Sequence, residues 1–331
     1  MSRKQRLQCS DCQSEAHVSR REFLQRASVL TAGAAFINAP WQGVYAAPSR
    51  SSTAETAAQK LYETLSPAQR SQICLPFNHP SRTKISANWA VTKPAIHEDF
   101  YTVEQRGLIA EVFKGVTSAE GHERFQSQME FDDGGFDRYH VALFGDPQAE
   151  KFEWMLTGRH TTIRADGNSS AGSAFGGPVV YGHGDEDVKS NIFYYQTQQA
   201  NQVFKALDNA QAAKALVKNA PGETQVVLQG TRGTFGGISL QELSQDQRDL
   251  VAGVIKTLLN PYREEDVQEA MESLEQGGGV AGLHMAFYRQ GDLNNDGEWD
   301  IWRIEGPSFV CHFRGAPHVH AYLNIGTSKL S

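Results

Sequence analysis

Alternation of apolar and polar residues dominates the C-terminal part of the chain and predicts a series of neighbouring β-strands. In the last run, residues 318–325, the period of two gives an apolar face of Val319, Ala321, Leu323 and Ile325, and a polar face of His318, His320, Tyr322 and Asn324. Further strand-like runs precede it at residues 139–144, 152–164, 225–229, 284–289, 301–305 and 309–313.

Helical periodicity appears in separate blocks earlier in the chain. Apolar stripes run through residues 203–217 and 250–258 and predict two helices that each bury one face. Capping boxes at residues 66–69, 102–105, 117–120 and 244–247 predict four helix starts. Helices in blocks and strands adjacent in sequence indicate an α+β fold with a largely antiparallel sheet and a C-terminal β-meander.

Two near-copies, residues 65–70 and 243–248, suggest either a weak internal duplication or chance similarity in helix capping. The chain divides by composition into a signal region at residues 1–46, a flexible Ser/Thr/Ala-rich lead-in at 47–58, and one large α+β domain at 59–331.

The N-terminus predicts export. Arg20 and Arg21 form a twin-arginine motif, followed by an apolar run at residues 27–37 that is too short to span a bilayer. Small residues at 44–46 suit signal peptidase, so we expect a mature start near Ala47. The twin-arginine translocation machinery is then a partner, and the mature protein is periplasmic or secreted. Folded export is often used by proteins that load a cofactor in the cytoplasm, although a fast-folding passenger without one gives the same signal.

Charge and hydropathy exclude two classes of partner for the mature chain. Residues 1–46 hold six Lys or Arg and three Asp or Glu, so their removal takes the net charge from -7 to about -10. An acidic chain without a Lys/Arg cluster lacks the basic footprint of a nucleic-acid-binding protein. No later stretch is apolar over the length of a membrane span.

The four cysteines divide between the two regions. Cys9 and Cys12 fall in the signal region and resemble half of a zinc site. Cys74 and Cys311 remain in the mature chain, where an oxidising compartment permits a disulfide. The sequence does not decide whether the latter two meet.

Histidines supply the main candidate chemistry. His318 and His320 are two apart on one strand, which points both imidazoles to one face, and neutral imidazole is the commonest protein ligand for transition metals. His160, inside the run 152–164, and His284, at the start of a strand, offer a third and a fourth imidazole. On a continuous strand His160 shares its face with Trp154 and Leu156, so a core histidine bonded to backbone is the alternative.

A second cation site is a weaker possibility. Residues 292–300 resemble the first nine positions of an EF-hand-like calcium loop, with candidate ligands Asp292, Asn294, Asp296 and Asp300. Arg303 stands at the twelfth position, where a bidentate carboxylate belongs. A hairpin turn rich in Asp and Asn explains the same residues.

Several segments together resemble domain-of-unknown-function family 3500, a group of mostly bacterial proteins. In order along the chain they lie at residues 65–70, 76–77, Arg82, Trp89, 106–108, 143–147, Trp154, 158–160, 303–307 and 318–320. The family usually has Gly-His-His where this chain has Gly158-Arg159-His160, so only His160 carries over. His318 and His320 match the C-terminal His-x-His of the family, and His284 matches a histidine that often opens a strand. The family implies no established activity.

These observations lead to one hypothesis with two alternatives. An exported metalloprotein would bind zinc, copper or iron through His160, His318 and His320, with His284 as a further ligand, and use an open position to activate water or dioxygen. A secreted protein could instead hold a metal or a small molecule without catalysis. In the third interpretation the histidines form a metal-free polar network in the core.

Overall fold

The computed structural model describes residues 46–149, 151–293 and 295–327, which form one compact unit. The twin-arginine motif at Arg20 and Arg21 and the cysteines Cys9 and Cys12 lie outside the described residues. Among the helices within that range, every one is too short or too polar to cross a lipid bilayer.

An 11-stranded, largely antiparallel sheet forms the centre of the described part of the chain and confirms the predicted α+β class. Ten strands follow one path in the order β1-β2-β3-β4-β5-β11-β10-β9-β8-β6, and β7 pairs with β8 beside it. The strands of the first half are Cys74–Leu75 (β1), His140–Gly145 (β2), Phe152–Gly158 (β3), Thr161–Ala165 (β4) and Val179–His183 (β5). Those of the second half are Leu216–Val217 (β6), Ile238–Ser239 (β7), His284–Tyr288 (β8), Ile301–Glu305 (β9), Phe309–Arg314 (β10) and Val319–Ile325 (β11).

Eight α-helices are present in the residues that the structure describes. They are Thr53–Thr64 (α2), Pro67–Ile73 (α3), Val103–Gly115 (α4), Ala119–Asp133 (α5), Tyr194–Ala206 (α6), Asn209–Ala215 (α7), Gln245–Leu259 (α8) and Glu264–Gln276 (α9). The capping boxes predicted at Ser66, Thr102 and Ser244 are confirmed, since each side chain accepts the third amide of its helix. The fourth start lies one residue later than predicted, because Ser118 and not Thr117 caps α5.

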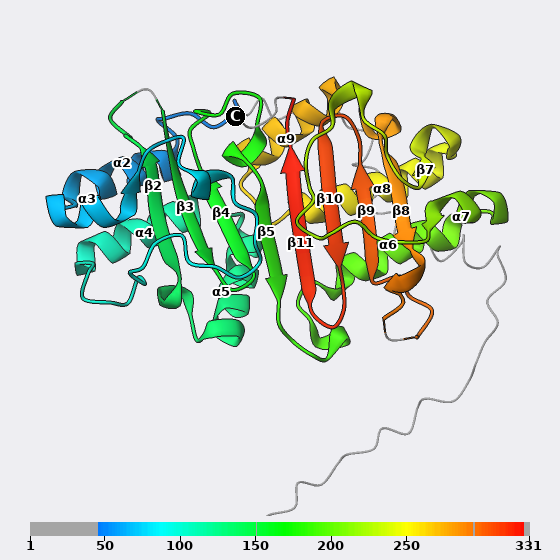
Figure 1. Ribbon diagram of the computed structural model, residues 1–331, viewed down its shortest axis with the longest axis horizontal. Coiled ribbons are helices and arrows are strands. Elements are labelled where there is room, and N and C mark those ends of the chain that lie inside the picture. Colours follow the sequence, from blue (N-terminus) through cyan, green and yellow to red (C-terminus); the bar gives the residue numbers. More distant parts are fainter. Residues whose placement is uncertain (1–45, 150, 294, 328–331) are drawn as a thin grey trace, which may run out of the picture. The chain divides into compact units, whose positions relative to one another are not determined.

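The two faces of the sheet have different covers (Figure 1). Helices α4, α5, α6, α8 and α9 lie behind it, and the alternating residues Val319, Ala321, Leu323 and Ile325 of β11 join their apolar core. In front, two irregular segments, 76–100 and 218–237, cross the strands. Small apolar clusters hold these segments down: Trp89 packs beside Phe144 and Met155, and Val226 and Leu228 pack beside Tyr322. The face that carries His320 and Tyr322 is therefore the loop-covered face, as the period of two predicts.

The order of elements is repeated within the chain. The series α2-α3-β1-α4-α5-β2-β3-β4-β5 recurs as α6-α7-β6-α8-α9-β8-β9-β10-β11, with β7 as an addition. In each half the short first strand runs parallel to its neighbour and the rest are antiparallel. The last strands of the halves, β5 and β11, pair antiparallel at the centre of the sheet. An approximate twofold axis therefore passes between β5 and β11.

Side-chain details support this duplication. Gln69 and Gln105 exchange side-chain hydrogen bonds of 2.8 and 3.2 Å, and Gln211 and Gln247 do the same at 3.1 and 2.8 Å. Gly158 ends β3 and Gly306 follows β9; a Cβ there would lie 2.3 Å from the Tyr139 ring and 2.7 Å from Leu283, respectively. The equivalences place α3 with α7 and α4 with α8. The near-copies at 65–70 and 243–248 thus belong to non-equivalent helices α3 and α8, although the duplication itself is present.

Three element predictions need correction. The run 152–164 is a hairpin rather than one strand, because the chain turns at Arg159 and His160 between β3 and β4. Residues 225–229 bury Val226 and Leu228 but form no strand among the described residues. The stripe 203–217 divides into α6 and α7, because the Asp208 side chain accepts the amides of residues 210 and 211 and starts a new helix.

The predicted lead-in at residues 47–58 contains the start of α2, which begins at Thr53. Buried alanines at 54, 57 and 58 together with Leu61 give this segment an apolar stripe that packs against α4. The Ser/Thr/Ala-rich composition of residues 47–58 therefore fits the start of a helix whose small side chains pack closely against α4.

The two described cysteines are free thiols. Cys74 lies on β1 and Cys311 on β10, with five strands of the sheet between them. They do not pair with each other in this fold. Burial raises the pKa of Cys74 to about 11, which keeps it a thiol at neutral pH.

Candidate functional site

His160 lies in the tight turn that joins β3 to β4. Its backbone is in the left-handed region, at φ 54°, a conformation that residues other than glycine seldom adopt. The turn is held by segment 76–100: the His160 amide donates to the carbonyl of Ala87 at 2.5 Å, and Asn88 forms a β-bridge with Arg159. An unusual backbone fixed in this way directs the imidazole away from β4 and across the loop-covered face.

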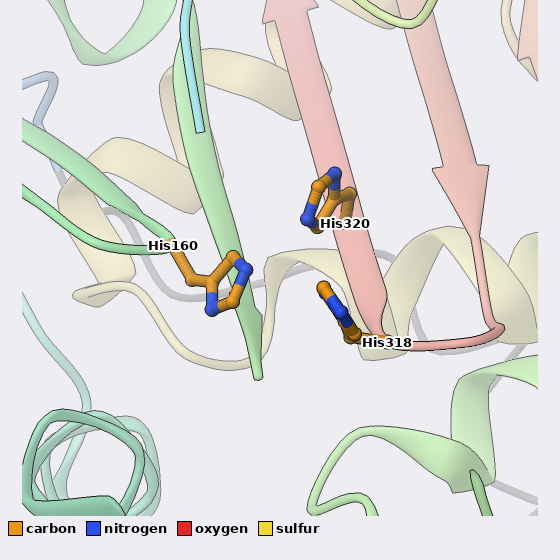
Figure 2. Close-up of side chains that lie close together, drawn as sticks. All are labelled: His160, His318 and His320. Atoms are coloured by element: carbon orange, nitrogen blue, oxygen red, sulfur yellow. The ribbon is translucent and has the colours of Figure 1, made fainter. Parts of the chain in front are cut away.

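Three imidazoles meet above the central strands. Figure 2 shows His160 reaching from its turn towards His318 and His320, which come from the start of β11. One ring nitrogen of each residue lies within 4.8 Å of the corresponding nitrogens of the other two. Bonds of about 2.0–2.1 Å to a tetrahedral ion would bring such nitrogens to about 3.3 Å apart, so closure requires ring movements of about an ångström. The three histidines can hold one metal ion.

Asp132 orients His160. Near the end of α5, its Oδ2 accepts a hydrogen bond from His160 Nδ1 at 2.7 Å, and both side chains are buried. Burial alone would raise the pKa of Asp132, but the bonds from His160, Gln128 and the Gly184 amide lower it overall, so it is a carboxylate at neutral pH. With Nδ1 as donor, Nε2 of His160 keeps its lone pair for a ligand.

Glu223 plays the same part for His320. This residue of segment 218–237 accepts from His320 Nδ1 at 2.9 Å and from the hydroxyl of Tyr322 at 3.3 Å. Burial would raise the pKa of Glu223, but the His320 bond and the nearby Arg314 lower it to about 2. Burial lowers the pKa of His320 more than Glu223 raises it, so His320 is a neutral donor at pH 7.

Arg314 contacts both Glu223 and His320. Its Nη1 pairs with Glu223 at 2.8 Å, and its Nη2 lies 3.0 and 3.1 Å from Nδ1 and Nε2 of His320. A metal ion at Nε2 would compete with that second contact. Arg314 therefore has to turn slightly when an ion binds.

His318 is the least constrained of the three. Its Nδ1 is buried and has no hydrogen-bond partner among the described residues. Burial is the first cause that lowers its pKa, and the neighbouring His160, Arg314 and Arg159 lower it further. A neutral ring with a free buried nitrogen is a suitable metal ligand, since the metal requires the unprotonated form.

The fourth predicted histidine lies elsewhere. His284 begins β8, three strands from β11 in the sheet, and pairs with Glu305 at the opposite end of the strands. It is the equivalent of His140, which begins β2. The structure therefore brings His160, His318 and His320 together and leaves His284 outside.

The candidate calcium ligands form a turn rich in Asp and Asn, which was the alternative to a calcium loop. Asp292 accepts the amides of residues 296 and 297, Asp296 accepts that of Glu298, and Asp300 accepts that of Leu293. Asn294 is not among the described residues. Within those residues, the three histidines are the only group of His, Cys, Asp or Glu spaced to hold a metal.

Sequence reasoning missed the groups that support the histidines. Asp132 is 28 residues from His160, and Glu223 is 97 residues from His320. Glu223 lies in a segment without strand or helix periodicity. A two-residue spacing identifies a strand face, but no comparable pattern marks a carboxylate that arrives from another element.

Comparison with known families identifies the family to which the chain belongs. Residues 48–324 match the family described as "Protein of unknown function (DUF3500)". The chain belongs to the DUF3500 family. The match includes all three clustered histidines and both halves of the duplicated fold, and it confirms the resemblance predicted from the sequence motifs. No curated protein and no solved structure matches the chain.

Membership in DUF3500 supplies no activity, so the chemistry has to be argued from the site. Arg159 lies next to His160 in the turn. His160 itself carries the contact with Asp132. The histidine of the turn is therefore the residue that faces His318 and His320.

Proposed function

We propose that this DUF3500 protein is an exported metalloprotein in which His160, His318 and His320 bind one transition-metal ion such as zinc, copper or iron. The convergence of three imidazoles from two distant segments carries this proposal. Three nitrogen ligands leave a coordination position open, which is the arrangement that metal enzymes use to activate water or dioxygen. A hydrolytic or oxidative activity follows from that open position.

The surroundings of the three rings support metal binding. Two of them donate Nδ1–H to carboxylates, and such contacts orient imidazoles in metal sites and make the other nitrogen a better ligand. Lowered pKa values at His318 and His320 keep these rings neutral at pH 7. Both features reduce the cost of binding a cation.

One observation favours a different role. Arg314 lies at the nitrogens of His320, so the same residues also form a connected polar network without an ion. In that alternative the network stabilises the loop-covered face. A secreted protein that holds a metal without turnover is the other alternative, and there a fourth group fills the open position.

Elemental analysis of protein purified from the periplasm tests the proposal. We expect close to one equivalent of a transition metal per chain and almost none in the double variant His318→Ala/His320→Ala. His284→Ala serves as the matched control, since it removes a histidine outside the cluster. Equal metal in the double variant and the control would contradict the proposal and support the metal-free network.

Absorption spectroscopy of the cobalt-substituted protein separates catalysis from storage. An open position predicts a spectrum that changes when imidazole is added, because the small ligand enters the coordination sphere. An unchanged spectrum would indicate a filled sphere and a binding protein without catalysis.

Export is part of the proposal and rests on Arg20 and Arg21. Replacement of both by lysine should retain the protein in the cytoplasm, which fractionation followed by immunoblotting would show. Unchanged periplasmic protein would remove the export element and leave the metal site untouched.

A further inference from the structure

Two arginines lie beside the three histidines. Arg159 precedes His160 in the β3–β4 turn, and Arg314 faces His320 from β10 in the sheet. A Cβ on Gly184 would lie 2.5 Å from Asp132 Oδ1, 3.2 Å from Arg159 Nη2 and 3.2 Å from His160 Cε1, so the guanidinium and the imidazole border one small space together with the Asp132 carboxylate. The charges of both arginines act on His318.

Their present partners differ. Arg314 is paired with Glu223 at 2.8 Å. The Arg159 side chain makes no hydrogen bond or ion pair with any of the described residues, and it is half-buried. A half-buried guanidinium without an acceptor is a binding group for an oxyanion, because five N–H donors in one plane match two oxygens of a carboxylate or phosphate.

The charges of the site lead to the same conclusion. The carboxylates of Asp132 and Glu223 balance the guanidinium groups of Arg159 and Arg314, and the three histidines are neutral ligands. A divalent ion would then leave two positive charges in a partly buried space. Uncompensated charge in such a space is costly, so an anion is the expected partner of the ion.

We infer that the open side of the metal site binds the oxyanion group of a small ligand, a carboxylate or a phosphate, between the ion and the guanidinium groups of Arg159 and Arg314. The inference rests on the proposed metal function and adds the class of ligand. Arg159 would contribute a fixed positive charge beside the three neutral imidazoles.

Titration of the cobalt-substituted protein with acetate, inorganic phosphate and imidazole tests this assignment through the absorption spectrum. We expect Arg159→Gln and Arg314→Gln each to weaken binding of at least one anion about tenfold or more, since each removes a charge-assisted hydrogen bond. Imidazole needs no guanidinium, so its affinity should change little. The anion that binds more tightly identifies the group as carboxylate or phosphate.

Arg138→Gln is the matched control, because it removes an exposed arginine from the turn before β2. Metal affinity is measured first for every variant, since Arg314 also contacts Glu223 and His320. Absence of metal from the unmodified protein would defeat the proposed function itself. Two results would overturn this inference and leave the proposed function intact. In both, the protein binds metal and the cobalt spectrum responds to imidazole. In the first, neither acetate nor phosphate binds; in the second, the anions bind equally tightly to the unmodified protein and to every variant.

Discussion

The β3–β4 turn and the β9–β10 turn are equivalent in the two halves of the fold, yet only the first carries a histidine. His160 in the first turn corresponds to Ser308 in the second. Asp132 from α5 hydrogen-bonds His160, whereas Gly277, after α9, packs so closely on Ser308 that a Cβ there would lie 2.1 Å from the Ser308 Oγ. Equivalent backbone positions thus hold a ring with its carboxylate in one half and two small residues in the other.

This difference shows that the duplicated fold provides the position but not the chemistry. The glycines that end β3 and β9 serve close packing in both halves. The charged and ligating groups occur at one of the two positions. A functional site in a duplicated protein is therefore better located by what differs between the halves than by what they share.

The largest contrast between the two turns concerns metal affinity. Structural zinc sites gain about 10–16 kcal/mol from about four ligands, so one ligand accounts for about 2.5–4 kcal/mol. His320→Ala should therefore weaken metal binding by about 100- to 1,000-fold, while Ser308→Ala leaves it unchanged. Competition with a chromophoric chelator measures both, and comparable losses in the two variants would break the contrast.

The next largest effect concerns two equivalent buried positions, Arg164 on β4 and His312 on β10. Arg164 pairs with Glu153, whereas burial lowers the pKa of His312 to about 4 from 6.5. Protonation of His312 therefore favours the unfolded chain. Stability should fall as pH drops from about 6.5 to 4, by up to about 3 kcal/mol.

Urea unfolding at several pH values checks this prediction on the metal-free protein. His312→Gln should flatten the dependence of the unfolding free energy on pH more than the variant of the half-buried His97, His97→Gln, does. A slope that is the same in both variants would show that other groups cause the acid sensitivity.

The carboxylates that orient the rings should contribute less than the rings themselves. Loss of such a partner commonly costs about 10–100-fold in metal affinity. Asp132→Asn should lie at the upper end of that range, because its side chain is fully buried, and Glu223→Gln nearer the lower end, because its side chain is 29% exposed. The reverse order would argue that burial does not determine the strength of these contacts.

The smallest effect is expected when the second turn is made to resemble the first. Ser308 is buried against Gly277, so Ser308→His should overpack this contact and destabilise the fold by about 1–3 kcal/mol. No second equivalent of metal should bind. Ser308→Ala is the control for stability, since the Ser308 hydroxyl has no hydrogen-bond partner among the described residues. A gain of metal in the histidine variant would mean that the second position is only one residue short of a site.

Much of the fold was predictable because it depends on local patterns. The period of two in residues 318–325 correctly placed His318 and His320 on the face opposite Val319 and Ala321, and capping chemistry located three helix starts. The turn at His160 was not found, because apolar residues continue on both sides of it and no glycine marks its left-handed residue. Strand β5 was missed because Gly176, Gly177 and Pro178 precede it and Gly182 interrupts it, a composition typical of a loop.

The site was predictable only in part. The His-x-His spacing is local, and the family resemblance supplied His160, but neither reports which elements converge. The prediction that His284 joins the group depended on its place at the start of a strand and on the family resemblance, whereas the duplication makes that residue the equivalent of His140, away from the three clustered histidines. Asp132, Glu223 and Arg314 depend on tertiary packing, for which a single sequence holds no signal.

An ion bound beside the paired strands β5 and β11 would connect the two halves of the fold in addition to its chemical role. His160 belongs to the first half and His318 to the second, and 158 residues separate them (318 minus 160). An ion held by both would close a loop of that length, and cross-links over loops of about 100 residues restrict the unfolded chain by about 5 kcal/mol. Loss of the ion would remove this cross-link while the pairing of β5 with β11 remains, so retention of metal and resistance to unfolding would rise and fall together.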